Sequence, residues 1–104
     1  MATTKGYFEY ISERLAAVDG VSFRPMMGEY ILYYRGKVVG GLYDDRLLVK
    51  VTDAGKRLMP TAEEQTPYDG AKPMLQVFDV DDGDFLARVI KATADELPAQ
   101  KRSK

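Results

Sequence analysis

The segment from Glu29 to Val51 constrains the fold most, because it reads as a three-stranded antiparallel meander. Three short runs rich in Tyr, Val, Leu and Ile are separated by Arg35-Gly36 and by Asp44-Asp45. Such dipeptides between β-prone runs are typical of two-residue hairpin turns. The sequence therefore predicts that these strands form the centre of the domain.

Two-residue turns fix which side chains share a face of this meander. Leu32 then faces Val39, and Leu42 faces Leu47. Because side chains alternate along a strand, each residue can be assigned to one face. The nearly all-apolar face, which we assign to the core beneath the helices, holds Ile31, Tyr33, Val38, Gly40, Leu42, Leu47, Val49 and Val51. The opposite face, which we expect to be open, holds Tyr30, Leu32, Tyr34, Lys37, Val39, Gly41, Tyr43, Arg46, Leu48 and Lys50.

The rest of the chain supplies helices and further strands around the meander. Apolar residues from Phe8 to Val18 recur at helical spacing, and we expect a helix from Thr3 or Thr4 to Asp19-Gly20. The other predicted elements are a strand at 21–24 ended by Pro25, a short helix at 52–59, a strand at 74–78 and a helix at 84–97. The fold class is α+β, with an antiparallel sheet of about five strands in the order α-β-β-β-β-α-β-α.

Composition places the chain in a class and removes several chemistries. At 104 residues it reads as one domain, residues 1–104, whose polar, basic end at 99–104 we expect to fray. There is no Cys, His or Trp, so disulfides, the commonest general base and the commonest transition-metal ligand are excluded. No apolar run approaches the roughly 18 residues that span a bilayer. We expect a cytoplasmic protein without a membrane partner.

The acidic cluster at 79–84 resembles a calcium loop, but the match fails. Its glycine falls at the fifth place instead of the sixth, and Ile90 stands where the bidentate Glu should be. We interpret Asp81 as the N-cap of the last helix, and Gly40-Gly41 as room for close packing or a bulge. The sequence thus predicts no metal site, no cofactor site and no catalytic residues.

The open face of the meander is the better candidate site. Tyr30, Tyr34 and Tyr43 lie there beside three basic residues, Lys37, Arg46 and Lys50. Aromatic and basic residues on one face suit a protein partner or a second copy of the chain. Single-stranded nucleic acid is an alternative partner. The net charge of −1, from 15 basic and 16 acidic residues, argues against it.

A third hypothesis concerns the loop from Pro60 to Pro73, which is too polar and too broken for a regular element. Connections of this length are often functional lids. Tyr68 and Lys72 on this loop, together with Arg24, could surround a small anion or serve an enzyme.

The chain resembles the TfoX/Sxy N-terminal domain family along nearly its whole length. The resemblance rests on the segments Met26 to Tyr30, Tyr34 to Val38 and Asp44 to Lys50, followed by Pro67-Tyr68 and Met74. It implies a two-layer α/β sandwich and a bacterial setting. Full-length members are competence regulators that coactivate transcription and carry a C-terminal helical half, which has no counterpart after the helix at 84–97. We therefore expect a stand-alone domain with a non-catalytic regulatory or protein-interaction role.

The turn at Arg35-Gly36 gives a first test. A two-residue hairpin turn favours a positive φ at Gly36, which a β-branched side chain strongly disfavours. We expect Gly36→Val to lower the free energy of unfolding by more than the roughly 0.5 kcal/mol of an ordinary surface substitution. Thermal unfolding measures this, and an unaltered melting temperature would refute the turn.

Overall fold

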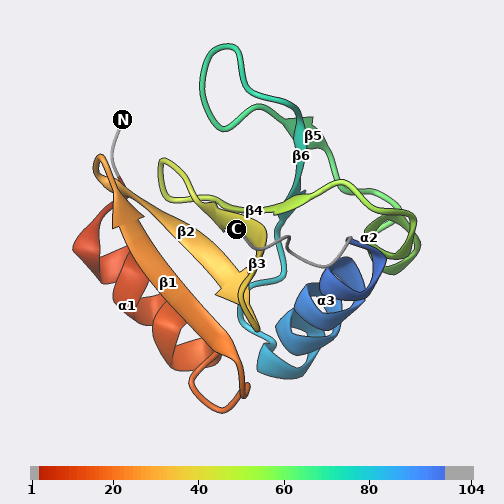
Figure 1. Ribbon diagram of the computed structural model, residues 1–104, viewed down its shortest axis with the longest axis horizontal. Coiled ribbons are helices and arrows are strands. Elements are labelled where there is room, and N and C mark those ends of the chain that lie inside the picture. The colour runs from red at the N-terminus through yellow and green to blue at the C-terminus, as the bar shows by residue number, and fades with distance from the viewer. Residues whose placement is uncertain (1–2, 98–104) are drawn as a thin grey trace, which may run out of the picture.

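The computed structural model describes residues 3–97, in which an antiparallel sheet carries helices on one side (Figure 1). The strands lie in the order β1-β2-β3-β4-β6-β5. The elements in chain order are α1 (Lys5–Arg14), β1 (Val21–Met26), β2 (Glu29–Tyr34), β3 (Lys37–Leu42), β4 (Leu47–Lys50), α2 (Asp53–Leu58), β5 (Glu64–Gln65), β6 (Met74–Val77) and α3 (Gly83–Glu96). The α+β class and the order of the main elements are confirmed. The sheet has six strands because β5, two residues from the expected loop, pairs with β6.

All three helical regions contribute to one hydrophobic core. Ile11 of α1, Met59 at the end of α2 and Ile90 of α3 pack with the strands in a single cluster. Leu42, Leu47 and Val49 of the meander are fully buried in this cluster, as predicted. Leu75 and Val77 of β6 are almost fully buried in it as well. Each such aliphatic side chain contributes about 1.5–3 kcal/mol by leaving water. We call the side of the sheet opposite this core the outer face.

A β-bulge in β3 reverses the predicted faces of β2. Both hairpin turns have two residues as expected, but the register shifts so that Leu32 pairs with Gly40 instead of Val39. Val39 is the extra residue, and its side chain is fully buried in the core. Tyr30, Leu32 and Tyr34 therefore face the helices.

Because of the bulge, most residues before Gly40 in the meander lie on the face opposite to the one predicted from the sequence. Ile31, Tyr33 and Val38 lie on the outer face, not in the core. Val51, also assigned to the core, is 37% exposed and lies beyond the end of β4. The prediction was wrong here because a bulge, like a turn insertion, moves every side chain on one side of it to the other face.

Two glycines next to the bulge permit the close approach of β3 to its neighbours. A Cβ on Gly40 would lie 2.1 Å from the backbone oxygen of Leu48 and 2.8 Å from the Cα of Val49. A Cβ on Gly41 would lie 2.6 Å from the backbone oxygen of Tyr30 and 2.6 Å from the ring of Tyr43. Glycine is required at both positions, and the expectation that Gly40-Gly41 gives room for close packing is confirmed.

Helix α1 begins where predicted and ends early. Thr4 is its N-cap, and the Thr4 hydroxyl accepts a hydrogen bond from the Tyr7 N–H at 3.2 Å. The helix ends at Arg14 instead of continuing to Asp19-Gly20. Val18 still packs against the core from the turn that follows. The apolar side chains here satisfy burial without a continuous helix, which helical spacing alone does not reveal.

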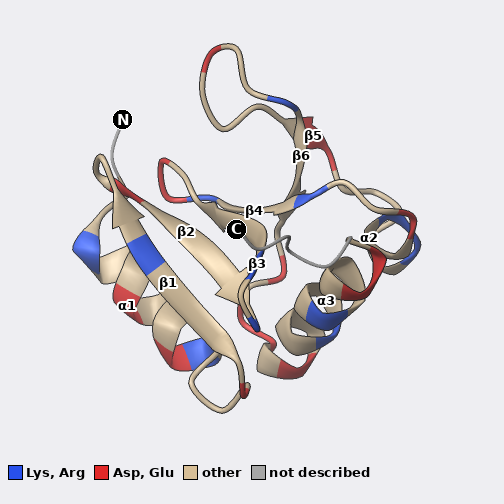
Figure 2. Cartoon of the chain, viewed as in Figure 1, with Lys and Arg blue, Asp and Glu red and all other residues tan. Residues whose placement is uncertain are grey.

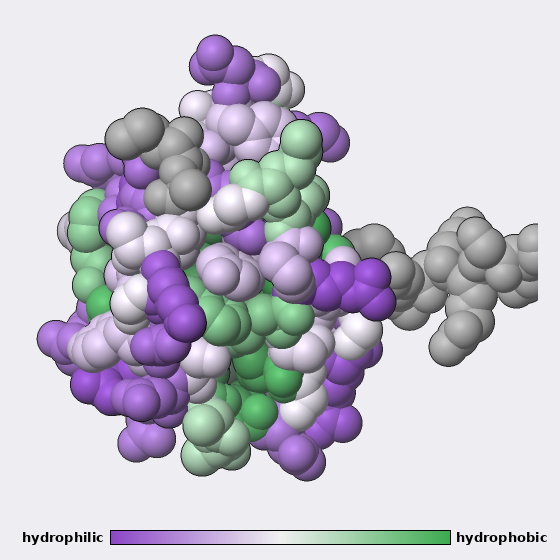
Figure 3. Space-filling model, turned by 90° about the vertical axis from the view of Figure 1, so that its left-hand side faces the viewer, coloured by the Kyte–Doolittle hydropathy of each residue, from purple (hydrophilic) through white to green (hydrophobic). Residues whose placement is uncertain are grey.

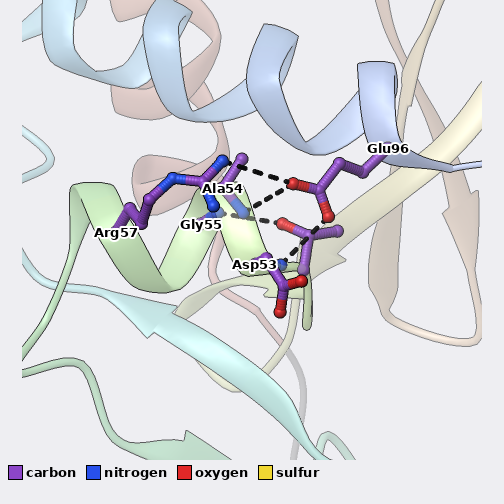
Figure 4. Close-up of polar contacts among 6 residues, drawn as sticks. Asp53, Ala54, Gly55, Arg57 and Glu96 are labelled. Carbon is purple, nitrogen blue, oxygen red and sulfur yellow. Dashed lines mark hydrogen bonds and ion pairs between the residues drawn. The ribbon is translucent and has the colours of Figure 1, made fainter.

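The caps of the two later helices interlock (Figure 4). Thr52 is the N-cap of α2, the helix expected at 52–59, and its Oγ1 accepts a hydrogen bond from the Gly55 N–H at 3.0 Å. Glu96 near the end of α3 accepts from the N–H groups of Asp53 and Ala54 at 3.0 and 2.7 Å. Arg57 lies 3.7 Å from the same carboxylate. These contacts hold α2 and the C-terminal turn of α3 together.

The N-cap of α3 is one residue later than predicted. Asp82, not Asp81, accepts a hydrogen bond from the Phe85 N–H, at 3.1 Å. Asp84 in the first turn complements the helix dipole as expected.

Gly40 provides the sharpest test of this packing. We expect Gly40→Ala to destabilise the fold by about 2 kcal/mol or more, because backbone atoms of β4 would have to move. Gly6 in α1 is the matched control, since a Cβ there meets nothing within 4 Å. Gly6→Ala should leave stability unchanged or raise it by up to about 1 kcal/mol. Equal effects of the two substitutions in urea unfolding would contradict the register.

Candidate functional site

The structure separates the six residues of the predicted partner surface. Tyr30 faces the helices, and its ring stacks on Phe8 of α1 with a centroid distance of 4.0 Å. Tyr34 is 8% exposed and belongs to the core. Only Tyr43, Arg46 and Lys50 lie toward the outer face. The prediction of one open face bearing all three tyrosines is wrong because of the bulge in β3.

Lys37 has a structural role at the end of α3. Its Nζ donates to the backbone oxygens of Ala94 and Leu97 at 2.9 and 3.2 Å. The last turn of α3 contains no basic residue of its own. Lys37 thus adds hydrogen bonds to carbonyl groups at the C-terminal end of α3, where the Ala94 oxygen also accepts from the Leu97 N–H. It places a positive charge at the negative end of the helix dipole.

Arg46 is held at the β3–β4 turn. Its Nε donates to the Tyr43 backbone oxygen at 3.1 Å, and its Nη1 donates to Gln65 Oε1 at 3.4 Å. Arg46 therefore links the turn to the short strand β5, and its guanidinium is partly committed to that role.

The outer face that the structure does present begins on the edge strand β1. On the side of the molecule where β1 lies, apolar residues gather in the middle of the surface and hydrophilic ones surround them (Figure 3). Arg24 of β1 pairs with Ile31 of β2, and its guanidinium carbon lies 5.9 Å from the centre of the Tyr33 ring. Ile31 and Tyr33 are half-buried, as is Val38, which pairs with Tyr33. We call these four residues the strand patch. In the described part of the chain, the helices lie on the side of the sheet opposite the strand patch (Figure 1).

A groove continues the outer face beyond the strand patch. The segment 67–73 forms one side of it, and the strands β3, β4 and β6 form its floor. Its volume is about 490 Å³. It is lined by Val38, Tyr43, Lys50, Val51, Pro67, Tyr68, Ala71, Lys72, Pro73, Met74 and Leu97. Mostly apolar hollows with a few polar groups are the usual form of binding sites.

Two tyrosines face each other at one end of the groove. The Tyr43 ring lies against the backbone of Gly41 and is 7% exposed. The Tyr68 ring is tilted by 59° to it at a centroid distance of 6.3 Å and is 58% exposed. Burial raises the pKa of Tyr43, and Tyr68 and Glu29 raise it further. The Tyr43 hydroxyl therefore stays protonated at neutral pH and can donate a hydrogen bond.

The groove brings together some residues of the predicted anion site and some of the predicted partner surface. Tyr68 and Lys72, predicted around a small anion, both line the groove, together with Tyr43 and Lys50 from the predicted partner surface. Arg24, the third residue of the anion hypothesis, belongs to the strand patch and is not among the groove residues. Pro67 and Pro73, which bracket the wall, are visible in the sequence and mark this segment as irregular. The sequence does not indicate the fold that brings the wall to β4.

The acidic groups near the β3–β4 turn are used internally. Glu29 Oε1 accepts from the Thr3 hydroxyl at 2.7 Å and from the Asp44 N–H at 3.1 Å. Asp45 Oδ1 accepts a hydrogen bond from the Thr4 N–H at 2.8 Å.

Among residues 3–97, no group of three or more metal-ligating side chains comes together. In the same residues, no helix has the length and apolar character needed to cross a bilayer.

Comparison with known proteins places the chain in a family. A family model for the TfoX N-terminal domain matches residues 13–96. The chain belongs to the TfoX N-terminal domain family. The match covers all six strands and ends with α3, so the strand patch and most of the groove lie inside it. The resemblance seen in the sequence is thus confirmed.

A curated relative supports the same assignment. It is described as an uncharacterized 12.7 kDa protein in the trpE 5′ region of Spirochaeta aurantia. It is 37% identical over 105 residues, covering 100% of this chain and 91% of the relative. No solved structure gives a significant match.

The buried tyrosine of this TfoX N-terminal domain gives a pH test. The folded-state pKa of Tyr43 lies above its ordinary value of 10.0. As pH rises through about 10, the unfolded chain loses this proton first and binds fewer protons than the folded state. The stability contribution is therefore fully present below that pH and is lost above it.

We expect the free energy of unfolding to fall between about pH 8 and pH 10.5, and to fall less in Tyr43→Phe. Tyr7 also has a pKa raised by burial, so Tyr7→Phe should remove a further part of the loss. Denaturant unfolding at both pH values measures these differences. Equal losses in Tyr43→Phe and the parent would contradict the burial of this hydroxyl.

Proposed function

We propose that this TfoX N-terminal domain is a non-catalytic binding module whose protein partner docks on the strand patch. The supporting observation is the position of Ile31, Tyr33 and Val38 on the face opposite the helices, beside the exposed Arg24. Side chains on the other face of the same strands are buried by α1 and α3. Tyrosine, arginine and aliphatic residues together are typical of the centre of a protein interface.

Charge indicates the chemistry of the partner. Arg24, Arg46 and Lys50 project from strands or strand ends toward the outer face, although the chain as a whole carries a net charge of −1. Figure 2 shows positive residues on β1 and at both ends of β4, in addition to those on the helices. A partner with an acidic surface fits this face, because complementary charge favours encounter and register.

The same charge argues against a second copy on this face. In a symmetric dimer, the same patch contacts itself, so the basic side chains of one copy would approach those of the other. Like charges across an interface are costly. The strand patch thus favours a different protein over self-association.

Nucleic acid fits less well than it did from the sequence. The proposed stacking platform included Tyr30 and Tyr34, and both are on the helix side of the sheet. Sequence-tolerant binding of single strands uses several exposed aromatic rings along a basic groove. On the strand patch, Tyr33 is the one ring, and Arg24 already lies over it.

The role suggested by the family resemblance follows from such docking. A regulatory domain of the TfoX/Sxy type would act by recruiting or blocking its partner, and the chemistry would belong to that partner. We propose that the protein does this in a bacterial cytoplasm.

Site-specific cross-linking tests the proposal. A photoreactive phenylalanine analogue replaces Tyr33 in one variant and Arg88, exposed on α3, in a control variant. Each is produced in the native host in place of the parent. We expect a discrete adduct with one acidic protein from position 33, and none from position 88.

A charge reversal supplies the second arm. Adding Arg24→Glu to the Tyr33 variant should reduce the yield of the adduct by about fivefold or more, since it removes one charge contact and adds a repulsive one. Arg88→Glu should leave the yield unchanged. The proposal is overturned if positions 33 and 88 give the same adducts, if the adduct contains nucleic acid, or if both charge reversals act alike.

A further inference from the structure

We propose that the groove is a second binding site, which takes a small organic anion with an apolar body, of the aryl carboxylate class. This inference does not depend on the strand patch having a protein partner. The two sites adjoin at Val38, which belongs to both.

The shape of the groove suits a small molecule. Its floor is formed by strand residues such as Val38 and Met74, and its wall by the segment that contains Pro67, Tyr68 and Pro73. Leu97, directly after α3, lies at its margin. Sites for small ligands have volumes of roughly 300–1,000 Å³ and largely apolar, aromatic linings. The volume of about 490 Å³ falls inside that range.

The fold builds the aromatic end of the groove. Gly41 is the reason that the Tyr43 ring lies flat against the sheet, because any Cβ there would come within 2.6 Å of the ring. In the wall, the Ala71 N–H donates to the Tyr68 backbone oxygen at 3.1 Å, and Gly70 between them has φ of +84°. This hydrogen bond closes the turn that carries Tyr68, and the Tyr68 ring lies with its centroid 6.3 Å from that of Tyr43. The two rings give the groove an aromatic end that suits a flat apolar group.

Charge selects an anion. Lys50 and Lys72 are exposed at the groove, and among residues 3–97 no Asp or Glu lines it. Lys50 pairs with Met74 in the sheet, and Lys72 belongs to the wall two residues before Met74, so both lysines line the groove near the start of β6. A carboxylate on an aromatic body would meet lysine at its charged end and the tyrosine rings along its length.

A carboxylate is favoured over a phosphate ester. Phosphate sites usually add an arginine fork or several backbone N–H groups to the lysines. Within the described part of the chain, no arginine lines the groove, and the apolar side chains that line it outnumber the charged ones.

The end of the chain has the wrong charge to be the occupant. The sequence after Leu97 is Pro98 to Lys104, which contains Lys101, Arg102 and Lys104 and no acidic residue. Two lysines at the groove repel such a segment and attract an anion.

The experiment measures binding of 2-naphthoate to the full chain by methyl-detected NMR. We expect the probe to shift the methyl resonances of Val38, Val51 and Met74 in a saturable way, while those of the core residue Ile90 stay in place. The uncharged isostere 2-naphthamide should bind at least about threefold more weakly, as expected for one exposed charge contact.

Variants separate the two parts of the site. Lys50→Met and Lys72→Met should each weaken naphthoate binding by about two- to fivefold and leave naphthamide unaffected. Tyr68→Ala should weaken both probes. Lys91→Met, on the exposed side of α3, is the matched control and should change neither.

Three results would overturn the inference. They are no saturable shift at these methyl groups, equal affinity for acid and amide, or equal effects of Lys72→Met and Lys91→Met. Arg24→Glu keeps the two proposals distinct, because it should reduce partner cross-linking at the strand patch by about fivefold or more and leave the affinity for naphthoate within about twofold.

Discussion

The close approach of β3 to its neighbours is the constraint on which the rest of this structure depends. Gly40 and Gly41 place no side-chain atoms in the narrow space between β2, β3 and β4, and the register of β2 against β3 shifts by one residue at Val39, directly before them. Between the Arg35-Gly36 turn and the bulge, β2 and β3 keep the pairing that the turn sets. Beyond the bulge, each residue of β2 pairs one position further along β3, so the face of β2 that was expected to be open lies toward the helices.

Function follows from this reversal of faces. Because Tyr34 joins the core, the outer face keeps Tyr33 with Arg24 on its β1 side and the groove on its β4 side. Lys37, on the helix side, is free to cap α3. A partner on the strand patch and an anion in the groove would meet at Val38, which provides a direct physical route for one to influence the other.

The sequence predicted what depends on local chemistry and misassigned what depends on the bulge. The two-residue turns, the start of the first helix near Thr4, the short helix at 52–59 and the strand in which Leu75 and Val77 share a face follow from propensity and period. The bulge leaves no comparable pattern in the sequence, because both faces of β2 carry apolar and aromatic residues and either face could cover the core. The groove was missed as a unit because its wall, centred on Tyr68, reaches β4 through the non-local pairing of β6 with β4.

The face assignment of β2 is the central claim, and through-space contacts in solution test it most directly. A nuclear Overhauser spectrum of the labelled protein should connect the ring protons of Tyr30 with those of Phe8, whose centroids lie 4.0 Å apart. The ring of Tyr33 should show contacts with Val38 and none with Phe8. Contacts between Tyr33 and Phe8, with Tyr30 free of them, would show that β2 has the opposite face toward the helices and would contradict this account.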